Sequence, residues 1–138
     1  MTSTKRVVIV GASGMVGGYA LGYLLDDPAV GEVTSIGRRN LGISNSKLTE
    51  ILQPDFADCS AVADALSNQD AAVFCLGVYT GAVPDEDLRR ITVDYTVEFA
   101  RVLRASSPGA TFAFLSGGGA DPTGRSRLAF ARYGAREP

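Results

Sequence analysis

Hydrophobic positions along the chain fall into two kinds of segment that alternate. Five short runs rich in β-branched and aromatic residues have the length of buried strands, and they lie at residues 6–10, 33–36, 48–52, 71–75 and 111–115. Between them, three segments favour helices: Met15–Leu25, Ala61–Leu66 behind an Asp58 or Ser60 cap, and Asp85–Arg104. Strands that alternate with helices are typical of βαβ units, so we predict a parallel sheet.

The predicted helix Asp85–Arg104 has the clearest periodicity. Its apolar residues recur every three or four positions and form one stripe of Leu88, Ile91, Tyr95, Phe99 and Val102. Acidic residues begin this helix and basic residues end it, as the helix dipole favours. The aromatic residues of the stripe are therefore expected in the core.

Length and composition indicate one globular domain. With 138 residues, the chain can bury a core but is too short for a nucleotide-binding half and a substrate-binding half of ordinary size. A hydrophobic content of 46% is typical of globular proteins, and a net charge of -2 gives no electrostatic reason to expect nucleic acid as a partner.

The first 25 residues resemble a signal peptide only superficially, because glycines interrupt the apolar run and its beginning is β-branched. No stretch reaches the length of a membrane span. Cys59 and Cys75 show neither metal spacing nor a disulfide framework, so a cytoplasmic location is expected. The chain contains no histidine, which excludes Ser-His-Asp and Cys-His catalysis and any His-ligated metal site within it.

The glycine-rich segment GASGMVG, residues 11–17, lies where the first strand turns into the first helix. Its glycines are Gly11, Gly14 and Gly17, a GxxGxxG spacing. A dinucleotide turn needs a tight bend, a side-chain-free approach for the pyrophosphate, and close packing of helix on sheet. The phosphates would bind at the start of the helix, within Gly11, Ala12, Ser13, Gly14, Met15, Val16 and Gly17. The alternative is a purely structural glycine turn; a Walker loop is excluded because no GK[ST] follows.

Two arginines follow the second predicted strand in the sequence SIGRRN. An acidic residue there would bind the ribose 2'-hydroxyl of NAD, whereas arginine accommodates the 2'-phosphate of NADP. Arg38 and Arg39 therefore favour NADP over NAD. The alternative is that both are surface residues of a loop.

Five motifs occur in order along the chain: GASGMVG, GRR, DFAD, CLG and LSGGGAD. Together they resemble the atypical short-chain dehydrogenase/reductases, specifically the Tat-interacting-protein-like branch of the NAD-dependent epimerase/dehydratase-like group. The resemblance implies that Asp55 and Phe56 border the adenine and that Leu76 and Gly77 line the cofactor ribose. It also implies that Ser116 stands at the active-site end of the fifth strand.

Reductase chemistry in that family uses a Tyr followed four residues later by a Lys, whose charge can lower the pKa of the phenol. No tyrosine here has a lysine at that spacing. By resemblance, Phe130 takes the place of the Tyr and Gly134 that of the Lys. Tyr133 could substitute as proton donor, but without a neighbouring lysine its pKa should stay near the usual value of about 10.

We predict a Rossmann-type, doubly wound parallel sheet in three αβα layers, with strand order 3-2-1-4-5 and the nucleotide crevice between strands one and four. Residues 1–138 would form an NAD(P)-binding domain without the C-terminal substrate-binding part that the resemblance implies. The expected function is NADP(H) binding with carbonyl or alcohol oxidoreduction on an unknown small molecule. The alternatives are an inactive cofactor sensor or scaffold, or a fragment without function. An uncovered sheet edge would favour a homodimer.

Overall fold

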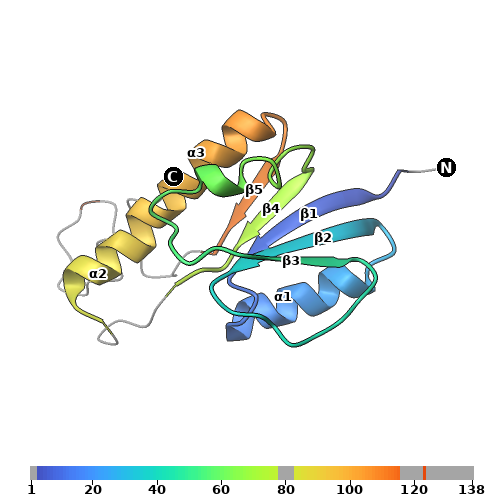
Figure 1. Cartoon of the computed structure of the whole chain (residues 1–138), viewed down its shortest axis with the longest axis horizontal. Coiled ribbons are helices and arrows are strands. Elements are labelled where there is room, and N and C mark those ends of the chain that lie inside the picture. Colours follow the sequence, from blue (N-terminus) through green and yellow to red (C-terminus); the bar gives the residue numbers. More distant parts are fainter. Residues whose placement is uncertain (1–2, 78–82, 116–122, 124–138) are drawn as a thin grey trace.

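A computed structural model of the chain describes residues 3–77, 83–115 and 123 (Figure 1). Five strands form a single sheet: β1 (Lys5–Val10), β2 (Val30–Gly37), β3 (Leu48–Leu52), β4 (Ala71–Phe74) and β5 (Thr111–Phe114). Every pair is parallel and the order is β3-β2-β1-β4-β5. This confirms the predicted fold class and strand order.

Helices cover both faces of the sheet, as Figure 1 shows, with α1 (Met15–Asp26) on one side and α3 (Tyr95–Ser106) on the other. The alternation of side chains along β1 divides the core in two. Val7 and Ile9 pack towards Leu21 of α1, whereas Val8 and Val10 join the cluster beneath α3. Within the described ranges, no helix has both the length and the apolar character needed to cross a bilayer.

The segment predicted as the helix Asp85–Arg104 is helical from Asp85 to Ser106, but it is not a single α-helix. A short α2 (Asp85–Arg89) leads into a π-helical turn, η2 (Arg90–Asp94), and then into α3. The Thr96 hydroxyl donates a hydrogen bond to the Thr92 carbonyl at 2.8 Å within this transition. Periodicity alone could not reveal the turn, because one inserted residue barely changes the spacing of the apolar stripe.

The α-helix predicted over Ala61–Leu66 is wrong. Only a 3-10 turn, η1 (Ser60–Val62), forms, followed by further turns up to Asn68, whose φ of +59° ends the run. At the end of these turns the Leu66 carbonyl accepts a hydrogen bond from the Ser107 hydroxyl, which directly follows α3. Neither proposed cap is found, because the N-cap of η1 is Cys59 and no side chain caps it. Asp58 instead forms a local turn just before η1, in which its Oδ1 accepts a hydrogen bond from the Ser60 amide at 2.9 Å.

Candidate functional site

The turn between β1 and α1 requires glycine at two of its three glycine positions. Gly11 has φ +88°, and a Cβ there would lie 2.6 Å from the Cys75 carbonyl carbon. A Cβ on Gly17 would lie 1.9 Å from the Gly11 carbonyl oxygen. The backbone that follows β4 thus leaves no room for a side chain at Gly11, and the turn itself leaves none at Gly17. These contacts match the bend and the close helix packing expected of a dinucleotide turn.

Gly14 differs from the other two glycines. A Cβ there would meet only the Gly11 oxygen, at 3.5 Å, which is an ordinary contact. Gly14 is the N-cap of α1, and no side chain caps the helix amides. The first turn of α1 therefore offers unpaired amides and the positive end of the helix dipole. The packing of the protein itself does not require a glycine at position 14.

A crevice opens beside this turn at the carboxyl ends of the strands. It is lined by Val10, Gly11, Ala12 and Ser13, by Ser35, Ile36, Gly37, Arg38, Arg39 and Leu41, and by Phe56 and Leu76. They come from the last residues of β1 and β2 and from the segments that follow β1, β2, β3 and β4, so four parts of the chain far apart in sequence meet here. In an open parallel sheet, this edge is where ligands bind.

Arg38 and Arg39 both line the crevice, and both are exposed. Among the described residues, neither forms an ion pair. No acidic side chain belongs to the crevice lining. The charge at the end of β2 is therefore positive and available to an anionic group.

The loop that follows the arginines is held in place by side chains. The Leu41 amide donates to Oε1 of Glu50 on β3 at 2.8 Å, and the Gly42 amide donates to Oδ1 of Asn40 at 2.9 Å. Gly42 has φ +72°, which glycine adopts without strain. Leu41, which sequence reasoning missed, is thereby fixed against the crevice.

The segment after β3 places its two predicted residues differently. Phe56 is 1% exposed and lines the crevice. Asp55 is exposed and outside the lining, and its Oδ1 accepts a hydrogen bond from the Ala57 amide at 2.9 Å. The adenine contact implied for Asp55 thus stays a prediction, while the observed contact of its carboxylate is with its own loop.

The residues after β4 divide between two hollows beside the glycine turn. Leu76 belongs to the crevice, whereas Cys75 and Gly77 line a second hollow with Gly14, Met15, Val16, Gly17 and Leu115. Burial raises the pKa of the Cys75 thiol, so it is a weaker nucleophile than an exposed cysteine. The two hollows flank the turn where the strand order reverses between β1 and β4.

Ser116, Phe130, Tyr133 and Gly134 lie outside the described residues, so the catalytic prediction stays untested. The crevice residues Ser35, Ile36 and Gly37 were missed, although their position at the end of a parallel strand is a signal that could have found them.

Comparisons with known proteins agree with this architecture. The profile of the NAD dependent epimerase/dehydratase family matches residues 7–128. Protein HTATIP2 of Rattus norvegicus is 31% identical over 119 residues, which cover 85% of this chain and 49% of that protein. The chain thus spans about half the length of this curated relative.

Solved structures share the fold. Glucuronic acid dehydrogenase from Chromohalobacter salexigens superposes with a TM-score of 0.78 at 19% identity, covering 96% of this chain and 52% of that one. A variant of uronate dehydrogenase from Agrobacterium tumefaciens, solved as a complex with NAD, gives a TM-score of 0.75 at 18% identity, covering 97% and 54%.

Proposed function

The chain belongs to the NAD-dependent epimerase/dehydratase family, and on that premise we propose that it binds NADP(H) in preference to NAD(H) along the crevice and the second hollow. The observation that carries this proposal is the glycine turn beside an arginine pair. Gly11 and Gly17 leave no room for a side chain, and Arg38 and Arg39 directly follow β2, in a crevice whose lining contains no carboxylate. The residues present therefore fit a dinucleotide.

Each part of the cofactor has a matching set of residues under this proposal. The turn from Gly11 to Gly17 would hold the pyrophosphate at the start of α1. Phe56 would contact the adenine, since it is the aromatic residue in the crevice lining. Leu76 and Gly77, which follow β4, would line the cofactor ribose. The arginines would bind the 2'-phosphate.

The choice between the two cofactors rests on the arginines alone. The matching family is described as NAD dependent, and three structures of similar fold were solved with NAD. Both cofactors share the adenine, the pyrophosphate and the nicotinamide, and they differ at the ribose 2' position. A 2'-phosphate beside Arg38 and Arg39 would form charge-assisted hydrogen bonds, each contributing roughly 1.5–3 kcal/mol.

Calorimetric titration tests this choice directly. NADPH is expected to bind at least about tenfold more tightly than NADH, because one charge-assisted hydrogen bond corresponds to about that factor. The double variant Arg38→Ala with Arg39→Ala should weaken NADPH and leave NADH nearly unchanged. Arg104→Ala, at the far end of α3, is the matched control and should change neither affinity. Equal affinities in the wild type would refute the NADP preference.

We also propose that the family reaction is carbonyl or alcohol oxidoreduction. The bound nicotinamide would supply or accept the hydride. Ser116 would orient and polarise the carbonyl, and Tyr133 is the available phenol for the proton. Because Phe130 and Gly134 stand where the resemblance expects Tyr and Lys, the residues of this chain hold no efficient proton donor at those positions.

Little or no turnover is therefore expected from this chain. Incubation with NADPH and a panel of aldehydes and ketones should leave the absorbance of NADPH at 340 nm almost unchanged, although titration shows binding. The variants Ser116→Ala and Tyr133→Phe should not differ from the wild type. Rapid NADPH oxidation that either substitution abolishes would show that the proton donor was misassigned.

A further inference from the structure

The loop after β3, residues 53–60, carries Phe56 into the crevice and is held in place by helix α3. Oε2 of Glu98, on α3, accepts a hydrogen bond from the Cys59 amide at 2.8 Å. The Glu98 side chain is only 15% exposed and does not line the crevice. A carboxylate on one element thus fixes the backbone of another, 39 positions away in sequence.

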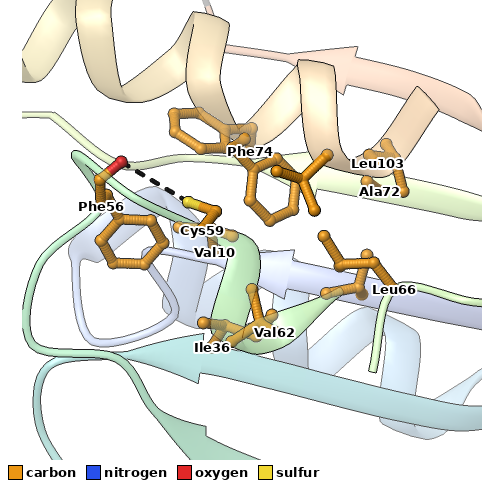
Figure 2. Close-up of a cluster of buried hydrophobic side chains, with 12 residues drawn as sticks. Val10, Ile36, Phe56, Cys59, Val62, Leu66, Ala72, Phe74 and Leu103 are labelled. Atoms are coloured by element: carbon orange, nitrogen blue, oxygen red, sulfur yellow. Dashed lines mark hydrogen bonds between the residues drawn. The ribbon is translucent and has the colours of Figure 1, made fainter. Parts of the chain in front are cut away.

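Hydrogen bonds within the loop connect Cys59 to Phe56. The Cys59 thiol donates to the Phe56 carbonyl oxygen at 3.5 Å, as the dashed line in Figure 2 shows. Nε2 of Gln53 donates to the Asp55 and Asp58 carbonyl oxygens at 2.7 and 2.9 Å. These hydrogen bonds connect the backbone at Phe56 with that at Cys59, so a contact that holds Cys59 also acts on the part of the loop that carries Phe56.

Cys59 remains a thiol donor at any physiological pH. Burial raises its pKa to about 12, and the carboxylates of Glu98 and Asp58 add to the shift. Figure 2 places Cys59 with Phe56, Val10 and Ile36 in one buried cluster. The bond from the thiol to Phe56 is thus protected from solvent as well as from ionisation.

Glu98 uses separate oxygens for Cys59 and for its ion pair. Oε1 accepts from Nε and Nη2 of Arg101, both at 2.8 Å. This hydrogen bond, followed by the one from the Cys59 amide, lowers the pKa of the Glu98 carboxyl. Arg101 is 65% exposed. The ion pair lies on the solvent side of Glu98, and the hydrogen bond to Cys59 lies on the loop side.

Resting on the proposed function, we propose that Glu98 is a positioning residue for the adenosine end of the cofactor, which acts through Cys59 on the loop that carries Phe56. A second contact also joins this loop to α3, because the centre of the Phe56 ring lies 6.3 Å from that of Tyr95 on the helix. Without the carboxylate, the Cys59 amide loses its partner and the loop is free to take positions in which Phe56 no longer lines the crevice. Affinity falls by the fraction of time spent in those positions.

Three variants of the full chain separate this role from a general effect on stability. Glu98→Ala removes the acceptor, Glu98→Gln keeps an oxygen for the Cys59 amide, and Arg101→Ala removes only the ion pair. The probes are NADPH and adenosine 2',5'-bisphosphate, each titrated by calorimetry. Glu98→Ala should weaken both probes by the same factor, roughly tenfold, as expected for a lost charge-assisted hydrogen bond. Glu98→Gln and Arg101→Ala should stay within about threefold of the wild type.

Amide hydrogen exchange gives a readout independent of the ligand. Glu98→Ala should speed exchange at residues 57–60 without changing residues 99–103 of α3, and Glu98→Gln should restore the protection. If Glu98→Ala does not fold, Glu98→Asp takes its place, since the shorter side chain keeps the charge but withdraws the oxygen from Cys59.

Unchanged affinity in Glu98→Ala would overturn the inference while leaving the proposed function standing. Equal losses of affinity in Glu98→Ala, Glu98→Gln and Arg101→Ala would also overturn it. The loss would then come from breaking the ion pair between Glu98 and Arg101, and not from the missing acceptor for the Cys59 amide. Failure of the wild type to bind either probe would refute the proposed function, and this inference with it.

Discussion

Replacing Gly17 by alanine is expected to abolish measurable cofactor binding and to destabilise the fold. The new Cβ would lie 1.9 Å from the Gly11 carbonyl oxygen and 2.6 Å from the Gly11 carbonyl carbon. Both are backbone atoms of the turn, so no flexible side chain can yield, and α1 must move away from β1. We expect a loss of about 1–3 kcal/mol in the free energy of unfolding and of at least about 100-fold in NADPH affinity, because the phosphate-binding amides are displaced.

Gly22→Ala is the matched control in the same helix. A Cβ at Gly22 meets nothing within 4 Å, so this change should leave binding intact and stabilise α1 by up to about 1 kcal/mol through helix propensity. Urea unfolding and calorimetric titration of both variants provide the comparison. Wild-type affinity in Gly17→Ala would contradict the assigned geometry of the turn.

Replacing Phe74 by alanine should have the largest effect on stability. Phe74 is fully buried at the end of β4, and its ring lies 5.3 Å from Phe99, 5.9 Å from Phe112 and 6.2 Å from Phe114. Truncation removes one ring from this aromatic cluster and leaves a cavity between the sheet and α3. Such a change costs about 3–5 kcal/mol, which is a large part of the roughly 5–15 kcal/mol that stabilises a typical domain.

Leu52→Ala provides the control for this measurement, since Leu52 also ends a strand but is 59% exposed. Its effect on the midpoint of urea unfolding should correspond to no more than about 0.5 kcal/mol. A similarly small effect for Phe74→Ala would mean that β5 and α3 do not pack on β4 as described. The free energy of unfolding of both variants is measured by urea titration, with circular dichroism as the signal.

Local patterns in the sequence determined the strands, their parallel pairing and the glycine turn. The run 48–52 coincides with β3, and Met15–Leu25 differs from α1 by one residue, because hydrophobic periodicity reflects which face of an element is buried. The GxxGxxG spacing identified the close approaches at Gly11 and Gly17, since steric exclusion of a side chain leaves glycine as the remaining residue. Arg38 and Arg39 were located at the crevice from strand position alone.

Only the tertiary structure decided which side chains hold the crevice together. Nothing near Glu98 in the sequence connects it with Cys59, and the tie between Glu50 and Leu41 likewise joins β3 to a loop that precedes it. The turns observed in place of the predicted helix Ala61–Leu66 are tied to a distant segment in the same way, since the Leu66 carbonyl accepts a hydrogen bond from the Ser107 hydroxyl, 41 positions away. Hydrogen bonds of this kind form only where the sheet and α3 place segments distant in sequence next to each other. The periodicity of hydrophobic residues indicates which face of an element is buried, but not which distant segment lies against it.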